Sequence, residues 1–373
     1  MTFEDFFTRI ATQHTSQLPF VVYRKPRETN INALLQTTNN LYNVSDFTEK
    51  GFVFSPFDDA ELSVLIPEEL SEMLITPNVS QNVVETFKLN TVFNTSNKEK
   101  NHHINLVTKG IEAINNKEFK KVVLSRQETV NLTNASFLSI FKNLLNAYPL
   151  AFVYCWYHPK VGLWLGATPE TLIKIEGNQF SIMALAGTQV YDGSLDVNWG
   201  NKELNEQQFV TDFIIDNLKP LVEKFNVSST ETVKAGSLLH LKTIISAQLK
   251  TTSNLKTLIS AIHPTPAVCG LPKFEAKQFI LKNENYNRSF YTGFLGELNL
   301  ETIKAPRSGK RNIENRAYAI TKKNTQLYVN LRCMQLVDKN AIIYVGGGIT
   351  SESEADKEWE ETVSKSLIIK NIL

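Results

Sequence analysis

The middle of the chain alternates hydrophobic and polar positions in short runs. Between residues 150 and 188, four runs rich in aromatic and β-branched residues are separated by His-Pro, Thr-Pro and Gly-Asn pairs, which favour turns. Strands of this length joined by short turns form antiparallel hairpins. The pattern therefore predicts an antiparallel meander over the runs AFVYCWY, GLWLGA, TLIKIE and FSIMALA.

Helical periodicity flanks this meander on both sides. Before it, the pattern predicts a helix around residues 104–116, a strand over 119–130 and a helix over 136–148. After it, a third helix carries an apolar face that includes Val210, and Glu206 lies one turn earlier. The Glu206 carboxylate is therefore expected beside the buried face of this helix.

The last quarter of the chain contains two further strand patterns. Residues 326–336, QLYVNLRCMQL, alternate as one strand and place Tyr328, Asn330 and Arg332 on its polar face. The next run, AIIYVGGGIT, predicts a strand that ends in a glycine triplet.

Such a glycine turn before a helix can cradle an anion, because backbone N–H groups approach the ligand closely. A plain turn that needs positive φ explains the glycines equally well. The Lys-Ser/Thr ending of a nucleotide phosphate loop is absent from this run. Ser351 and Glu354 then predict a capping box at the start of the last helix.

Within that last helix, the stretch DKEWEETVSK places Glu358, Glu361 and Lys365 at spacings of three and four, and hence on one face. Two interpretations are open. The face is a solvated salt-bridge stripe, in which the pair Glu361 and Lys365 contributes a few tenths of a kcal/mol (~0.3), or its carboxylates bind a cation. Spacing alone favours the stripe.

Composition narrows the possible partners. The 39 basic and 38 acidic residues give a net charge of +1, and the chain has no long Lys/Arg run. We therefore expect a small-molecule partner, with no nucleic acid and no membrane. The N-terminus lacks the apolar core of a secretion signal, which predicts a cytoplasmic protein. Three cysteines without a CxxC pair argue against a disulfide framework and a zinc site.

Lys121 and Glu170 are candidate acid–base groups. Lys121 shares a strand face with Phe119 and Val123, so desolvation would lower its pKa towards neutrality and make it a general base. The alternative is a lysine at a strand edge that extends to water. Glu170 follows a proline between two predicted strands, where its carboxylate either enters a cleft or solvates a turn; the pattern favours the turn.

The sequence offers two kinds of candidate metal ligand, histidines and carboxylates. His240 and His263 lie 23 positions apart without a third ligand at zinc-like spacing, so we interpret them as core or hydrogen-bonding histidines. Glu206, Glu358 and Glu361 form an all-oxygen set instead, and such hard ligands suit Mg²⁺.

Nine short motifs, in order along the chain, resemble those of the chorismate-utilising enzymes. The resemblance implies one large α+β domain in which two antiparallel β-sheets pack face to face and are flanked by helices. Residues 1–100 carry no motif and would form the N-terminal, motif-poor part of the same fold, with residues 101–373 as the chorismate-binding catalytic region. A predicted loop or linker covers residues 93–102. The motifs are KVVLSR, GATPE, ALAGT, NKELNEQQFV, HLKT, HPTPAVCGLP, YVNLRC, GGGI and EWEETVSK.

Within this family the motifs are similar to those of the isochorismate synthases, and the resemblance implies a role for each matching residue. Lys121 would activate water to attack C2 of chorismate, and Glu170 would protonate the departing C4 hydroxyl. The implied cofactor is Mg²⁺. Its ligands would be Glu206 and Glu361, with Glu358 in support. The implied substrate-binding residues are Ala186, Gly187, Thr188, His240, Ala267, Val268, Tyr328, Arg332, Gly347, Gly348 and Lys365.

One position separates the branches of the family. Where the anthranilate and aminodeoxychorismate synthases carry a lysine in PIKGT, this chain has Ala186 in ALAGT. Hydroxyl rather than ammonia is then the expected nucleophile, and no glutaminase subunit is expected. A salicylate synthase, which eliminates pyruvate from isochorismate, stays open because Val268 is compatible with either outcome. A non-catalytic chorismate-binding protein is the remote alternative. The chain departs from the family pattern at Glu203, Gln207 and Asn287.

Overall fold

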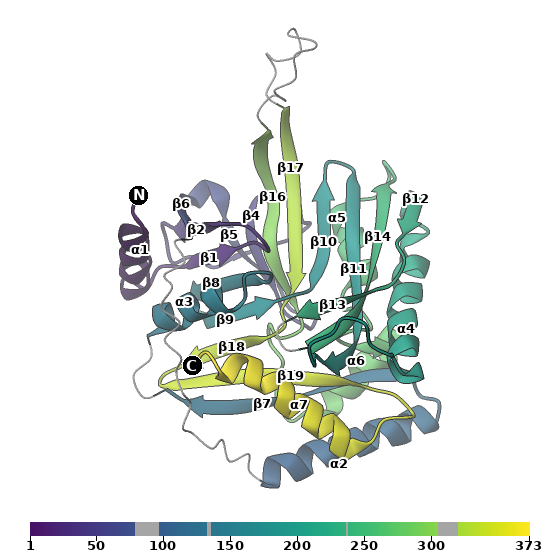
Figure 1. Ribbon diagram of the computed structural model, residues 1–373. Helices are drawn as coiled ribbons and strands as arrows, with labels where there is room; N and C mark the ends of the chain where they lie inside the picture. The colour runs from purple at the N-terminus through teal and green to yellow at the C-terminus, as the bar shows by residue number, and fades with distance from the viewer. Residues whose placement is uncertain (79–96, 133–135, 236–237, 305–319) are drawn as a thin grey trace.

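Two large antiparallel sheets, A and B, pack face to face (Figure 1). The structure is a computed structural model that describes residues 1–78, 97–132, 136–235, 238–304 and 320–373. In the view of Figure 1 the strands of one sheet run almost at right angles to those of the other. The sheets are flanked by helices, so the fold expected from the resemblance is confirmed.

Sheet A contains, in spatial order, β15 (Gly270–Leu271), β7 (Lys121–Asn131), β19 (Asn340–Ile349), β18 (Cys333–Val337), β9 (Gly162–Thr168), β8 (Phe152–His158), β1 (Phe20–Arg24), β2 (Asn30–Gln36) and β6 (Ser71–Pro77). Sheet B contains β12 (Val222–Val227), β14 (Leu238–Leu249), β11 (Gln179–Val190), β10 (Thr171–Glu176), β17 (Ile320–Val329), β16 (Phe294–Lys304), β4 (Gly51–Ser55), β5 (Val64–Pro67) and β3 (Tyr42–Asn43), and β13 (Glu231–Ala235) pairs with β14. The helices are α1 (Phe3–Thr15), α2 (Asn97–Asn115), α3 (Phe137–Ala147), α4 (Asn201–Leu218), α5 (Leu255–Ile262), α6 (Lys273–Asn283) and α7 (Ala355–Lys370), with a 3₁₀ turn η1 at Glu68–Leu70.

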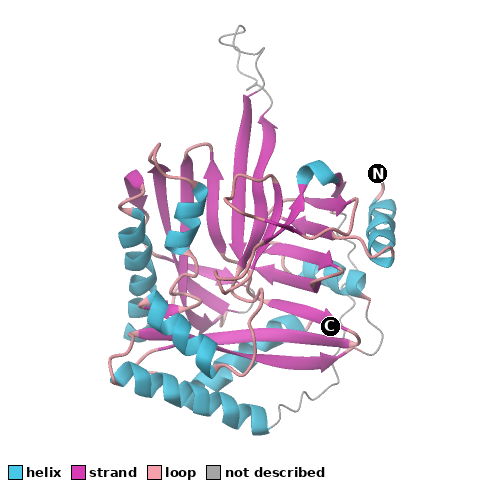
Figure 2. Ribbon diagram, turned by 180° about the vertical axis from the view of Figure 1, so that it is seen from behind, coloured by secondary structure: helices cyan, strands magenta, loops and turns pink. Residues whose placement is uncertain are grey.

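The core between the two sheets is unusually aromatic. Phe54 and Phe290 stack at 4.2 Å between ring centroids, and Phe152 and Tyr328 stack at 4.0 Å. Rings of this size bury a large apolar area and prefer offset or tilted contacts. Outside this layer, α1 and α3 cover sheet A, α4 and α5 cover sheet B, and α2 and α6 pack on β7 (Figures 1 and 2). No helix in the described ranges is long and apolar enough to cross a membrane.

Two of the points at which the chain changes from one sheet to the other are hydrogen-bonded to each other, and we call them the two passages. All four strands predicted between residues 150 and 188 form, but β8 and β9 pair in sheet A, whereas β10 and β11 pair in sheet B. The prediction of one continuous meander is therefore wrong. The switch between sheets occurs at Pro169 and Glu170, because proline cannot continue the hydrogen-bond ladder.

The second passage interrupts the predicted strand 326–336. The strand β17 ends at Val329 in sheet B, and β18 begins at Cys333 in sheet A, so one strand over this range is wrong. Arg332 between them has φ 49°, in the left-handed region that strands do not use. The Glu170 carbonyl accepts from Val329 N at 3.0 Å, so the two passages are hydrogen-bonded to each other.

The glycine triplet is also placed differently from its prediction. Gly346, Gly347 and Gly348 lie inside β19, and none has positive φ, so they do not form a turn. They leave the strand without side chains where α7 packs on it. The predicted capping box is wrong as well: Glu354 caps α7 without a side-chain hydrogen bond, and Ser353 Oγ accepts from Thr350 N instead.

The remaining local predictions hold with shifted ends. The helix predicted around residues 104–116 is α2, which begins at Asn97. Of the loop predicted over 93–102, residues 93–96 lie outside the described residues and the rest is helical. The strand over 119–130 and the helix over 136–148 correspond to β7 and α3.

Asn330 secures the second passage, and its removal tests how much the fold depends on it. Its side chain is fully buried, accepts from Tyr154 Oη at 2.6 Å and donates to the Phe290 carbonyl at 2.9 Å. Asn330→Ala leaves both groups unpaired, so we expect a loss of about 2–5 kcal/mol in the free energy of unfolding, measured by urea denaturation. The exposed Asn131→Ala in β7 is the control and should change it by less than about 0.5 kcal/mol. Equal stability of the two variants would contradict the assigned role.

Candidate active site

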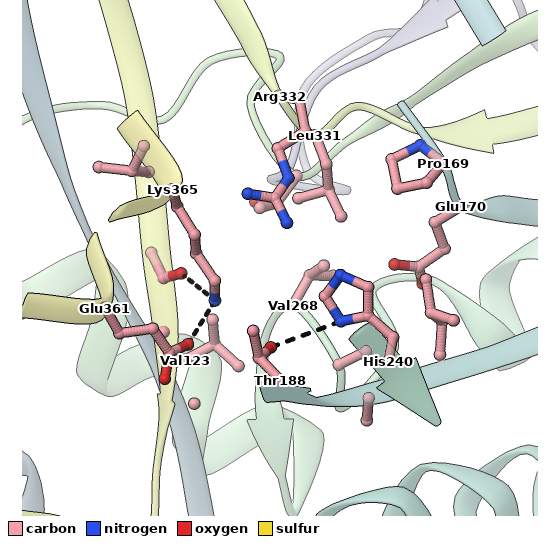
Figure 3. Close-up of a pocket in the computed structure, with 18 of the residues that line it drawn as sticks. Val123, Pro169, Glu170, Thr188, His240, Val268, Leu331, Arg332, Glu361 and Lys365 are labelled. Atoms are coloured by element: carbon pink, nitrogen blue, oxygen red, sulfur yellow. Dashed lines mark hydrogen bonds and ion pairs between the residues drawn. The ribbon is translucent and has the colours of Figure 1, made fainter. Parts of the chain in front are cut away.

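A cavity of about 740 Å³, mouth included, opens where the two passages between the sheets meet the glycine strand β19 (Figure 3). Its walls come from elements far apart in the sequence: both passages, the strands β11, β14 and β19, and the helices α4 and α7.

The structure brings together all but three of the residues predicted for the site. Lys121 and Glu358 lie just behind the wall, next to Gly348 and Gly347 respectively, whereas Tyr328 lies elsewhere. The predicted residues that line the cavity are Glu170, Ala186, Gly187, Thr188, Glu206, His240, Ala267, Val268, Arg332, Gly347, Gly348, Glu361 and Lys365.

Tyr328 does not reach the cavity. It is 1% exposed in the aromatic layer between the sheets, and its ring stacks on Phe152. The resemblance implied both Tyr328 and Arg332 as substrate-binding residues, and the predicted strand over residues 326–336 placed them on one face. Because the chain turns at Asn330, the two side chains go to different places.

Glu170 is a buried carboxyl in the first passage. It is 3% exposed, and Figure 3 shows its side chain at the cavity wall beside His240. Burial raises the pKa of Glu170 to about 8, although the charges of Lys121 and Arg332 oppose the rise. The carboxyl is therefore protonated at neutral pH and can donate a proton. The alternative of a solvated turn residue is wrong.

His240 offers a hydrogen-bond acceptor to the cavity. A bulge in β11, where Gly187 has φ 70°, turns the Gly187 carbonyl towards His240 Nδ1 at 2.8 Å. Burial lowers the pKa of His240 to about 3, with the nearby charge of Arg332 adding to the effect. The neutral ring then donates through Nδ1, and Nε2, which has no partner among the described residues, keeps its lone pair.

Two cations from different elements extend into the cavity. Figure 3 shows the Arg332 guanidinium and the Lys365 ammonium directed towards its centre. Lys365 Nζ contacts Glu361 Oε1 at 2.5 Å and the Gly346 carbonyl at 3.0 Å. Arg332 Nη1 has no hydrogen-bond partner in the described part of the chain. An anionic ligand would satisfy it, since a guanidinium binds carboxylates through two parallel hydrogen bonds.

Each carboxylate predicted to bind a metal is paired with a lysine. Besides the pair of Glu361 and Lys365, Glu206 Oε1 lies 2.8 Å from Lys121 Nζ. Glu358 Oε1 lies 2.6 Å from Lys202 Nζ. Burial alone would raise the pKa of Glu206, but the charge of Lys121 and of two further lysines outweighs it and lowers the pKa, so Glu206 is ionised at neutral pH.

The three carboxylates converge on the glycine strand. A Cβ added to Gly347 would lie 3.4 Å from Glu358 Oε2 and 3.6 Å from Glu361 Oε1. One added to Gly348 would lie 2.6 Å from Glu206 Oε1. Over the described ranges, no group of three or more His, Cys, Asp or Glu side chains is already arranged as a metal site. Glu358 Oε2 is nevertheless buried without a partner, and hard oxygen donors around side-chain-free backbone fit Mg²⁺.

Several lining residues were missed by the sequence analysis. Tyr291 and Thr292 approach from the segment before β16, and Leu331 approaches from the second passage. No local pattern indicates them, because their position depends on the passage between sheets. Tyr344 is different: it lies two residues before Gly346 on the same strand, so alternation in β19 could have found it.

The departures from the family pattern lie outside the cavity. Gln207 is buried and donates to the Ala184 carbonyl at 3.2 Å and to Thr243 Oγ1 at 2.9 Å. Asn287 accepts from Ser289 N at 2.7 Å near the surface. Neither position lines the cavity, nor does Glu203.

Comparison with known proteins agrees with this geometry. Residues 58–304 match the family described as chorismate binding enzyme, and residues 317–371 match a second family of the same description. The chain belongs to the chorismate-binding enzymes.

Several proteins with similar sequences are named isochorismate synthases. MenF of Pasteurella multocida is 28% identical over 276 residues, covering 72% of this chain and 60% of that protein. EntC of Escherichia coli K12 is 28% identical over 263 residues, covering 68% of this chain and 62% of that protein. The match thus spans about three fifths of the length of these relatives. The solved structure of MenF, the menaquinone-specific isochorismate synthase from Escherichia coli, superposes with a TM-score of 0.74 at 18% identity, covering 95% of this chain and 88% of that one.

The raised pKa of Glu170 predicts a pH-dependent stability. Between its unfolded pKa of about 4.3 and its folded pKa of about 8, the folded protein keeps a proton that the unfolded chain has lost. The free energy of unfolding therefore falls as pH rises through this window, by up to about 1.4 kcal/mol per pH unit. Glu170→Gln removes this component, so urea denaturation from pH 5 to 8 should show a shallower decline for the variant. Parallel curves would contradict the assignment.

An added methyl group is expected to have different effects at Gly348 and at Gly346. If Glu206 is a Mg²⁺ ligand, as the resemblance implies, Gly348→Ala should preserve the fold but lower Mg²⁺ affinity about tenfold, because the added methyl group presses on the end of the flexible Glu206 side chain. Gly346→Ala meets the Leu124 carbonyl at 2.7 Å and should lower the melting temperature instead. Calorimetric Mg²⁺ titration and thermal unfolding separate the two. Unchanged Mg²⁺ affinity in Gly348→Ala would show that Glu206 is not a ligand.

Proposed function

We propose that this protein is an isochorismate synthase, which converts chorismate to isochorismate by water attack at C2 and loss of the C4 hydroxyl. The observation that carries the proposal is a cavity lined by a protonated buried acid, Glu170, with a lysine of another element, Lys121, just behind its wall. The relatives at 28% identity that bear this name support it.

Lys121 is the base in this proposal. Its Nζ accepts a proton from the water that attacks C2, which requires the neutral amine. Lys121 is fully buried and held by Glu206 at 2.8 Å, so this pair must open before the step. Glu170 gives its proton to the C4 hydroxyl, which leaves as water while the ring double bonds shift. One proton is taken up and one is given, so the reaction is a balanced isomerisation.

Mg²⁺ is the proposed cofactor. Glu206 and Glu361 would hold it as main ligands, and Glu358 would support it through its unpartnered Oε2. Bound there, the ion would act as a Lewis acid on the ring carboxylate. The three lysines that pair with these carboxylates keep the charges balanced in the metal-free protein.

Arg332 and Lys365 would orient the substrate. Both are directed into the cavity (Figure 3), and the unpartnered Arg332 Nη1 suits the enolpyruvyl carboxylate beside the backbone of Gly348. His240 Nε2 can accept a hydrogen bond from a ring hydroxyl. Ala186 lines the wall without an amine, which supports water as the nucleophile.

Product analysis tests the proposal. Purified protein incubated with chorismate and Mg²⁺ should form isochorismate, identified by NMR. Lys121→Ala and Glu170→Gln should each lower kcat at least a hundredfold, with chorismate binding retained in calorimetry. Lys120→Ala, which changes the exposed neighbouring lysine, is the matched control and should keep wild-type kcat.

The other outcomes separate the alternatives. Salicylate together with pyruvate would make the protein a salicylate synthase. Unchanged chorismate that is nevertheless bound would indicate a non-catalytic binding protein. Activity retained in Lys121→Ala would refute the assignment of the base.

A further inference from the structure

Two faces of the helix α7 make contacts with the rest of the protein. Glu361 and Lys365 line the cavity and Glu358 lies next to Gly347 just behind its wall, whereas a second stripe at spacings of three and four faces the strand β7 and the helix α2. Figure 1 shows α7 lying along β19 and β7, next to α2. The second stripe is fully or almost fully buried and consists of Trp359, Thr362, Ser366 and Lys370.

One arginine of β7 contacts several turns of this second stripe. The Arg126 guanidinium lies 4.4 Å from the centroid of the Trp359 ring, and its Nε donates to Thr362 Oγ1 at 2.9 Å. Its Nη1 donates to Glu128 Oε2 at 3.1 Å, and Glu128 in turn forms an ion pair with Lys370. Arg126 thus acts on α7 from Trp359 to Lys370, directly or through Glu128.

The strand beneath α7 provides little to fix the position of the helix along its axis. Side chains that interlock across an interface normally fix it, but β19 has none at Gly346, Gly347 and Gly348. Arg126 lies opposite Val345 in the ladder, immediately before this triplet. Arg126 therefore supplies fixed contacts to α7 next to the part of β19 that has no side chains. Each residue of a helix rises 1.5 Å, so even a one-residue slip would move the carboxylates off the glycines.

We propose that Arg126 is a positioning residue, which fixes α7 on the glycine strand so that Glu358 and Glu361 meet over Gly347. The proposal rests on the metal-ligand role given to these glutamates in the proposed function. Arg126 does not line the cavity. It acts through Trp359 and Thr362, whose contacts need the planar guanidinium and a hydroxyl group.

Conservative substitutions on both sides of this contact test the proposal. Arg126→Lys keeps the charge but cannot stack and donate in the same plane, and Thr362→Val keeps the shape but loses the acceptor. Both should lower the Mg²⁺ affinity of the substrate-free protein about tenfold, measured by calorimetry. Both should also speed amide hydrogen exchange in α7 relative to α4. Thr362→Ser keeps the hydroxyl and should stay within about twofold of wild type.

A stability control separates positioning from general loosening. Tyr23→Phe removes a buried hydrogen bond to Glu297, 2.6 Å long and remote from α7. It should lower the melting temperature without changing Mg²⁺ affinity or α7 exchange. If Arg126→Lys and Thr362→Val behaved like Tyr23→Phe, Arg126 would be merely structural. If wild-type protein bound no Mg²⁺, the proposed function would fail, while the exchange measurement would still decide whether Arg126 positions α7.

Discussion

The two hydrogen-bonded passages between the sheets are the constraint on which the site depends. Thr168 Oγ1 donates to the Val329 carbonyl at 2.6 Å, and Ala167 N donates to the Arg332 carbonyl at 3.1 Å, so each passage holds the other. One passage delivers Glu170 and the other delivers Arg332. Both residues lie where strands end and the ladder hydrogen bonds stop. The cavity opens at this point. The fold thus brings an acid and a cation to the walls of the same cavity.

Charge balance is the second constraint. Three carboxylates lie around Gly347 and Gly348, and an unpaired buried charge would cost several kcal/mol (~3–5). In the structure, lysines from β7, α4 and α7 neutralise them. A divalent ion bound as proposed would compete with the lysines for these carboxylates. The pair of Lys121 and Glu206 is the most consequential, because it connects the proposed base with a proposed metal ligand.

The sequence predicts the local elements and the helix-borne half of the site well. Spacing places Glu358, Glu361 and Lys365 on one face, and a short-range helix rule is sufficient for this because a helix repeats the same geometry. The passages between sheets are different. A strand in sheet A and a strand in sheet B show the same alternation, so no pattern indicates that β9 and β10 belong to different sheets. The errors at Tyr328 and at the predicted meander share this cause.

The family resemblance indicated site residues that periodicity could not indicate, but it did not explain physically why they lie in the site. It assigned Glu170 and Arg332 to the site, whereas the pattern alone favoured a solvated turn for Glu170. The glycine triplet shows the same division. From the sequence pattern we predicted that the triplet forms a turn. In the structure it is part of a strand, and because it has no side chains, the carboxylates of a helix can lie close to its backbone. Glycine serves close approach here, rather than positive φ, and only the packing partner, α7, distinguishes the two uses. The proposed role of Arg126 follows from the same absence of side chains. The glycines of β19 cannot fix the position of α7 along its axis, so contacts outside the glycine stretch must do so.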